Sequence, residues 1–193
     1  DRAGGVYYKV DQINLNTGMI APGRPVELKL GLVLEGKEPE IQAGLQMAGV
    51  VTLDQDAGVI DIAGLDLAVD AKGQALPGGA LQAGLKSDLR AALDGSLLEV
   101  KGLRLSADEL NLSGEIQGRD LQTTPAFNGN LSLLEFDLRK WLVDRGFNLP
   151  KTADVKALTR VAADLKMQSD GAITRLEPVA LRLDDTSIDG SVN

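Results

Sequence analysis

The chain has 193 residues, of which 44% are hydrophobic and 3% aromatic, and its formal net charge at pH 7 is −8. The acidic balance and the scattered basic residues argue against a nucleic-acid-binding surface, because phosphates are bound by clustered Lys and Arg. Cys and His are both missing, which removes thiolate nucleophiles, the usual general base and the commonest transition-metal ligands. We therefore expect no enzyme activity, no catalytic residue, no cofactor and no metal site.

Two long runs near the start of the chain alternate strictly between apolar and polar residues. The first spans residues 26–34 and the second spans residues 41–53. A period of two is typical of a β-strand with one dry and one wet face. Five apolar positions on one face correspond to roughly 30 Å of strand, which is longer than usual.

A weak internal repeat follows, because residues 59–67 align without a gap on residues 97–105. In both copies the apolar phase slips by one residue beside a glycine, Gly64 in the first and Gly102 in the second. A one-residue slip with a glycine inside a strand predicts a β-bulge, which bends the strand and keeps its apolar side inward. Looser copies occur at residues 10–15 and 176–183.

Similar alternation recurs at residues 81–85, 110–116, 127–133 and 161–167, and short Gly-, Pro- and Asp-containing turns separate the runs. Strands joined by such short connections run antiparallel, as a meander. The predicted fold is all-β with one or two short helices. It is an extended antiparallel meander that forms either a curved, partly open β-groove or a sandwich-like sheet, in a single domain of residues 1–193.

One stretch, residues 134–145, has helical periodicity and is followed by Gly146, a suitable helix stop. Its predicted apolar stripe comprises Leu138, Trp141 and Leu142, with Leu134 as a further candidate at its start. A second short helix is predicted at residues 154–158. The first helix is expected to cap an end or the open face of the sheet, either as a plug in the core or as a gate at a groove mouth.

The last third of the chain resembles a known family. The stretch from Gly129 to Gly146 is a strand and then a helix, and Leu149-Pro150, Thr152-Ala-Asp154 and Ala157-Leu-Thr-Arg160 follow it. After a further strand comes Leu181-Arg-Leu-Asp-Asp-Thr-Ser-Ile-Asp-Gly190. This order is similar to the AsmA family of Gram-negative envelope proteins, and the match covers residues 126–193.

The resemblance implies a periplasmic portion of a protein anchored in the inner membrane. It implies a long, incompletely closed β-groove with an apolar interior, phospholipid acyl chains as ligands, and a role in lipid transport to the outer membrane. Other envelope proteins are implied as further partners. The chain begins at Asp1 without Met and lacks the family's N-terminal transmembrane helix, so we interpret it as a piece of a longer protein.

The candidate lipid-facing residues are the apolar members of the alternating runs. They are Val26, Leu28, Leu30, Leu32, Leu34, Ile41, Leu45, Met47, Val51, Leu53, Ile60, Ile62, Leu65, Leu67, Leu112, Ile116, Leu131, Leu165, Leu181 and Leu183. Apolar faces usually pack together in a core, so a sealed sandwich is the competing interpretation. Periodicity assigns a residue to a face and does not say what covers that face.

The same residues fit other functions less well. The acidic pairs Asp54/Asp56 and Asp184/Asp185 lack the spacing of a calcium-binding loop and are better explained as turn formers. Few aromatic residues disfavour a carbohydrate-binding domain. The main alternative to lipid transport is a structural module that supports outer-membrane protein assembly, with a sealed core and no lipid.

Overall fold

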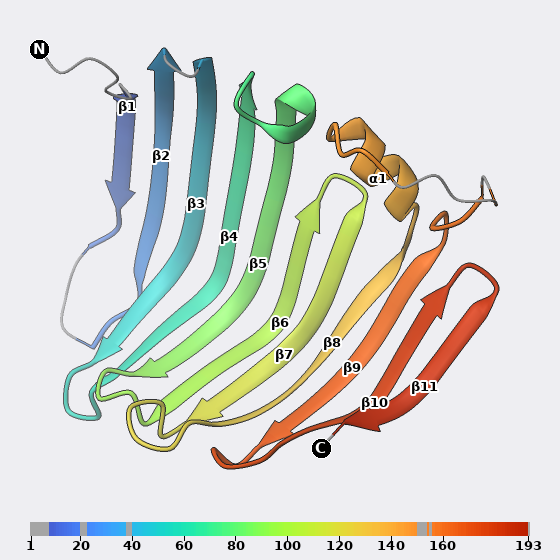
Figure 1. The fold of residues 1–193 in the computed structure, drawn as a ribbon. Helices are drawn as coiled ribbons and strands as arrows, with labels where there is room; N and C mark the ends of the chain where they lie inside the picture. Colours follow the sequence, from blue (N-terminus) through green and yellow to red (C-terminus); the bar gives the residue numbers. More distant parts are fainter. Residues whose placement is uncertain (1–7, 20–22, 38–39, 150–153, 155, 193) are drawn as a thin grey trace, which may run out of the picture.

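The structure, a computed structural model, describes residues 8–19, 23–37, 40–149, 154 and 156–192. It is one antiparallel sheet in which the eleven strands lie in the order of the chain (Figure 1). The strands are β1 (Tyr8–Thr17), β2 (Val26–Lys37), β3 (Glu40–Asp54), β4 (Val59–Gly73), β5 (Ala80–Ala92), β6 (Leu97–Ala107), β7 (Leu110–Arg119), β8 (Ala126–Phe136), β9 (Val161–Ser169), β10 (Thr174–Leu183) and β11 (Thr186–Val192). The predicted all-β antiparallel meander is confirmed. The sheet is curved and open, with β1 and β11 as its two edges.

The strands are long because the alternation in the sequence is long. β3 and β4 contain 15 residues each, whereas a typical strand has about five or six. Within the described residues, β2 and β3 pair without interruption from Val26↔Val51 to Lys37↔Glu40. A register slip of one residue would move the whole apolar set of a strand to the other face, so the sequence pattern holds this register.

The predicted β-bulges are present. The register shifts between Ile62 and Leu65 on β4 and between Val100 and Leu103 on β6. Gly64 and Gly102 lie inside these shifts with φ of 60° and 59°, a left-handed conformation that glycine adopts at little cost. The N–H of Gly64 donates to Oδ1 of Asp88 at 2.7 Å. The bulges bend the strands midway along their length, as Figure 1 shows.

The looser copies of the repeat also contain register shifts. One lies between Asp11 and Asn14 on β1, and the other lies between Leu176 and Val179 on β10. The sequence signal for a bend therefore recurs along the sheet and is not confined to the pair of well-aligned copies.

The described part of the chain forms a single layer. Its buried hydrophobic residues are Val59, Ala71, Phe136 and Val161, and no large side chain in it is fully buried. A compact monomer of 20.4 kDa is expected to expose about 8,800 Å², but this chain exposes 13078 Å². The excess is what a wide sheet with one uncovered apolar face would produce.

The predicted helices differ from those in the structure. The α-helix α1 runs from Leu138 to Asp144, shorter than the expected 134–145, because residues 134–136 belong to β8, whose Phe136 pairs with Val161. Asp137 caps the helix by accepting a hydrogen bond from the N–H of Lys140 at 2.7 Å. A short 3₁₀ turn, η1, occupies Pro77–Gly79.

The second predicted helix, at residues 154–158, is wrong. The described residues there form bends and turns, and Leu158 has a φ of 69°, which lies outside the right-handed helical region. Residue 155 lies outside the described residues.

Candidate functional site

The candidate site is the apolar face of the sheet, and the strand register shows how it is built. Directly paired residues lie on the same face, so the pairings can be followed from strand to strand. One row crosses all eleven strands and consists only of apolar residues. In strand order this row, the central row, is Leu15, Leu30, Met47, Leu67, Leu85, Leu105, Leu112, Leu133, Ala163, Leu181 and Ile188. Ten strand spacings of about 4.8 Å make it roughly 48 Å long.

A second row runs beside the central row, across β2 to β11. It contains one glycine and otherwise only apolar side chains. In strand order this row, the lower row, is Val26, Val51, Ile62, Leu89, Val100, Ile116, Gly129, Met167, Leu176 and Val192. The bulges of β4 and β6 lie between the two rows, so each strand keeps its apolar side on one face across its bend.

All 20 residues predicted as lipid-facing lie on this one face. Leu53 is exposed, and the others are half-buried. The β-bulge at Gly64 shifts the alternation of β4 by one residue. Ile62 and Leu67 therefore lie on the same face, although an odd number of positions separates them.

The face also contains apolar residues that are not among the predicted lipid-facing residues. They include Leu15, Leu85, Leu89, Leu105, Leu133, Met167 and Ile188. The alternation that identified the others is present around them as well, so the same signal could have found them.

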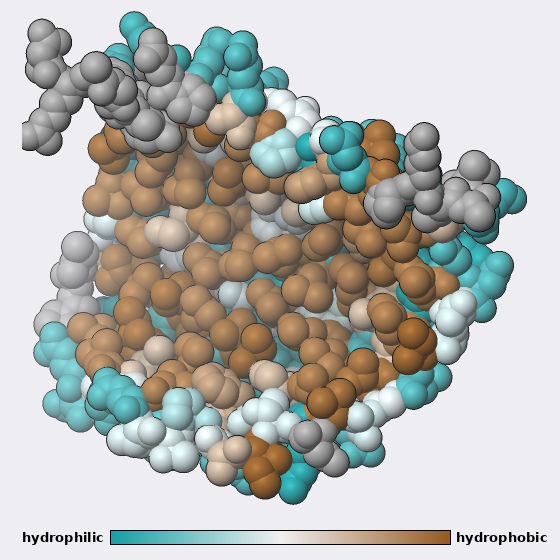
Figure 2. Space-filling view, in the orientation of Figure 1, coloured by the Kyte–Doolittle hydropathy of each residue, from teal (hydrophilic) through white to brown (hydrophobic). Residues whose placement is uncertain are grey.

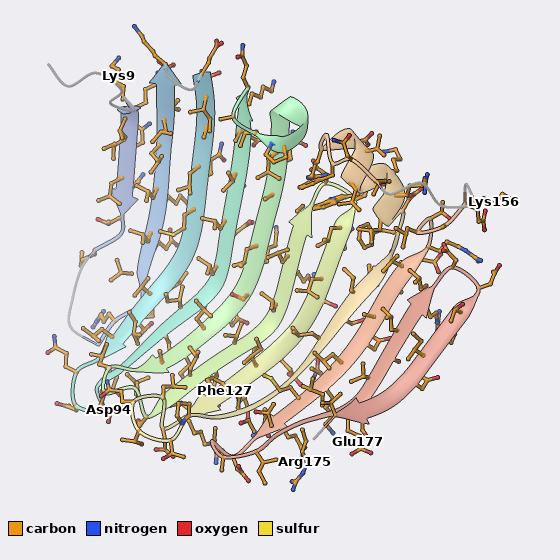
Figure 3. The ribbon with its side chains drawn as sticks, in the orientation of Figure 1. Lys9, Asp94, Phe127, Lys156, Arg175 and Glu177 are labelled. Carbon is orange, nitrogen blue, oxygen red and sulfur yellow. The ribbon has the colours of Figure 1, made fainter. Side chains whose placement is uncertain are left out.

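Figure 2 shows the face from the same direction as Figure 1, as a continuous hydrophobic surface framed by hydrophilic residues. Charged residues labelled in Figure 3, among them Asp94 and Arg175, lie at strand ends around its rim. The rows remain most exposed at the sheet edges, where Leu15 is 63% and Val192 is 58% exposed. In the described part of the chain, no other element forms a layer over the middle of the face.

The opposite face carries charged and polar side chains that pair across strands. Lys86 Nζ lies 2.8 Å from Oδ2 of Asp66, its direct neighbour on β4. The hydroxyl of Ser132 donates to Oδ1 of Asp164 at 2.6 Å, again between directly paired residues. An exposed ion pair such as Lys86–Asp66 contributes little stability, about 0–1 kcal/mol. Charged and polar side chains nevertheless make the second face hydrophilic, so the two faces differ sharply in polarity.

The helix α1 covers the end of the β6–β7 hairpin. Nε1 of Trp141 donates to the carbonyl oxygen of Ala107 at 3.3 Å, and the guanidinium of Arg145 lies 4.0 Å from the centroid of the Trp141 ring. Arg145 also pairs with Asp108 in the hairpin turn, and Lys140 Nζ lies 2.6 Å from Oε1 of Glu109. The predicted stripe of Leu138, Trp141 and Leu142 is half-buried. The helix therefore caps strand ends, and the roles of plug and gate remain predictions.

The Asp184 carboxylate organises the segment before β9. It accepts hydrogen bonds from the backbone N–H groups of Leu158 at 2.7 Å, Thr159 at 2.9 Å and Arg160 at 3.1 Å. These bonds, with that from Leu158 the largest cause, lower the pKa of Asp184 below its ordinary value of 3.8. The neighbouring Asp185 pairs with Arg160. Both acids lie in or beside the β10–β11 turn, but their carboxylates bind residues 158–160 of another segment and do not close the hairpin, whereas the turn interpretation predicts that they close it.

Among the described residues, no three Asp or Glu side chains converge as a metal site would require. None of the helices in that part of the chain is long and apolar enough to cross a membrane. Asp54 accepts a hydrogen bond from the N–H of Ala57 at 3.0 Å, which is the local bonding of a turn.

Comparisons with protein-family models, with curated proteins and with solved structures gave no match. The resemblance of residues 126–193 to the AsmA family therefore stays a prediction from the sequence. The site is defined by the strand register and the burial of its side chains.

Proposed function

We propose that this chain shields phospholipid acyl chains on its apolar face, as the periplasmic part of an AsmA-like protein that moves lipid between the inner and outer membranes. The observation that carries the proposal is the central row, an apolar residue on each of eleven strands. No second layer covers that row in the described part of the chain.

The energetics support an acyl ligand. Each CH₂ removed from water contributes about 0.8 kcal/mol, so a sixteen-carbon chain corresponds to roughly 12 kcal/mol. A lipid that crossed an aqueous compartment unprotected would face most of this as a barrier. A wide aliphatic surface lowers the barrier without any chemical step, and the face needs no catalytic group for this purpose.

The composition of the face indicates selection for tails and not for headgroups. Its rows consist of Leu, Ile, Val, Met, Ala and Gly, and branched or flexible aliphatic side chains tolerate ligands of different shape. The net charge of −8 disfavours recognition of anionic headgroups by long-range attraction. We expect binding to follow acyl chain length more than headgroup identity.

Native mass spectrometry of the purified chain tests the proposal. We expect co-purifying phospholipid, which exchanges for added phospholipid of defined chain length. A protein that is uniformly lipid-free and takes up no added phospholipid would contradict the proposal and favour the scaffolding alternative.

A matched pair of variants on β3 locates the binding surface. Met47 belongs to the central row, and its neighbour Gln46 points to the opposite, polar face. Met47→Asp places a carboxylate on the apolar face and should abolish photo-crosslinking to a lipid with a reactive group in its acyl chain. Gln46→Asp adds the same charge on the other face and should leave crosslinking unchanged. Equal crosslinking of both variants would show that lipid does not use this face.

A further inference from the structure

The apolar face extends to the strand ends at the lower side of the sheet in Figure 1, where β3, β5, β7 and β9 turn into the next strand. The register from β3 to β8 defines a further row on this face, which contains one glycine and otherwise only apolar side chains. In strand order this row, the rim row, is Leu53, Ile60, Ala91, Leu98, Gly118 and Phe127. Each member is the second residue from the end of its strand, and Figure 3 labels Phe127 at this rim.

Three turns at the lower rim carry a large aliphatic side chain that is exposed. Leu53 lies at the β3–β4 turn, Leu93 in the β5–β6 turn and Ile173 in the β9–β10 turn, and Leu93 is 65% exposed. Single exposed apolar residues are common, but these three lie on one rim beside a continuous apolar face, as on a surface that meets an apolar partner. At the opposite rim the β6–β7 and β10–β11 turns are Asp108-Glu109 and Asp184-Asp185.

An aspartate in each of the three lower turns binds the backbone of its own turn. Oδ1 of Asp94 accepts a hydrogen bond from the N–H of Ser96 at 2.9 Å, and Oδ1 of Asp170 accepts one from the N–H of Ile173 at 2.9 Å. Asp54 does the same in the β3–β4 turn. Each tip thus holds a carboxylate beside an aliphatic side chain. This combination fits the boundary between headgroups and acyl chains, because a charge is costly deeper in a bilayer.

We propose that the lower rim is the side on which the apolar face contacts a phospholipid bilayer, with the aliphatic side chains of the three turns inserted at the bilayer surface. The inference rests on the proposed function and adds the loading route to it. Lipid passes over this rim, along the strands, onto the rim row and then the lower row. On this path an acyl chain stays against apolar side chains, so little of it meets water. At the opposite rim, α1 covers the end of the β6–β7 hairpin.

The rate at which the protein extracts lipid from vesicles tests this route. The vesicles are phosphatidylcholine with a self-quenched fluorescent acyl-chain analogue, and they are neutral overall, so the charges of the rim do not decide the result. Leu93→Ser should slow extraction by about tenfold, because it removes a leucine that is partly buried in the bilayer during loading. Val143→Ser, on α1 at the opposite rim, is the matched control, since Val143 is 55% exposed. It should leave the rate unchanged.

A soluble short-chain phosphatidylcholine below its critical micelle concentration separates this inference from the proposed function. Such a monomeric lipid reaches the apolar face from water and needs no bilayer contact, so wild type and both variants should bind it equally. Equal binding together with equal extraction rates would overturn loading over the lower rim and leave the proposed function standing. Weaker binding of the monomeric lipid by Leu93→Ser would also overturn it, because Leu93 would then act within the binding face. A wild-type chain that binds no monomeric lipid would contradict both.

Single-cysteine labelling supplies a readout of the contact itself, because the chain contains no cysteine. Leu93→Cys and Val143→Cys are each labelled with an environment-sensitive fluorophore and mixed with phosphatidylcholine vesicles. We expect a blue shift of the emission at position 93 and none at position 143. A shift at position 143 alone, or at neither position, would overturn contact through the lower rim.

Discussion

The carboxylate of Asp184 accepts a hydrogen bond of 2.7 Å from the backbone N–H of Leu158, which lies 26 positions earlier in the chain. Together with the bonds from Thr159 and Arg160, it ties the β10–β11 turn to the segment that leads from α1 into β9. One side chain thus holds two loops that are distant in sequence.

This contact predicts a pH-dependent stability. The folded state lowers the pKa of Asp184 below 3.8, so its contribution is fully present at neutral pH and is lost as the pH falls through that lowered pKa. Asp184→Asn should lower Tm by several degrees at pH 7, with a smaller difference from wild type near pH 3. Thermal melts at both pH values check this.

The neighbouring acid provides the control for that experiment. Asp185→Asn removes a carboxylate that is 96% exposed, so it should change Tm little at either pH. A Tm difference for Asp184→Asn that does not shrink in acid would show that the carboxylate charge is not what holds the loops.

The β-bulge glycines give a second prediction. Gly64 has a φ of 60°, and a Cβ there would meet no atom within 4 Å, so the cost of substitution is conformational and not steric. Gly64→Ala should lower the free energy of unfolding by about 1 kcal/mol, because an L-residue is strained in the left-handed region. Urea denaturation measures it.

Gly31 on β2 is the matched position for that test. A Cβ there also meets nothing within 4 Å, and its φ lies outside the left-handed region. Gly31→Ala should raise stability by about 0.5 kcal/mol through the reduced entropy of the unfolded chain. Equal effects at the two glycines would argue against the bulge conformation.

Ser87 yields a third prediction. Ser87 lies opposite Leu65 of β4, on the apolar face of the sheet. It is 6% exposed, and its hydroxyl has no hydrogen-bond partner among the described residues. An unsatisfied buried hydroxyl costs about 1–3 kcal/mol, so Ser87→Ala should raise the free energy of unfolding by up to about 1 kcal/mol. Ser113→Ala, on the polar face, should be neutral. Destabilisation by Ser87→Ala would reveal a partner for the hydroxyl.

The helix cap gives a fourth prediction. Trp141, the single tryptophan of the chain, bonds to Ala107 and stacks beneath Arg145. Trp141→Ala should cost ~2 kcal/mol, less than for a fully buried tryptophan because the ring is only half-buried. Val143→Ala, an exposed site on the same helix, should cost much less. Denaturation followed by far-UV circular dichroism compares them.

Much of the sheet could be predicted from local pattern. Alternation places Leu30 and Met47 on one face, and the phase slip beside Gly64 predicts the bulge, because side-chain direction in a strand depends only on position and local conformation. The two helix predictions fail where residues far apart in the chain form hydrogen bonds with the backbone of the predicted helix. Residues 134–136 join β8 because β9 offers a partner at Val161. The predicted helix at 154–158 is replaced by turns, and Asp184, from another hairpin, takes the N–H of Leu158.

The sequence by itself determined that the chain forms long, two-faced, bent strands joined in a meander. Only the tertiary structure decided that the apolar rows line up in register across eleven strands, and that no second layer covers them in the described part of the chain. The reason is physical: a period of two assigns each side chain to a face within its own strand. Register and coverage arise from pairing and packing between residues far apart in the chain.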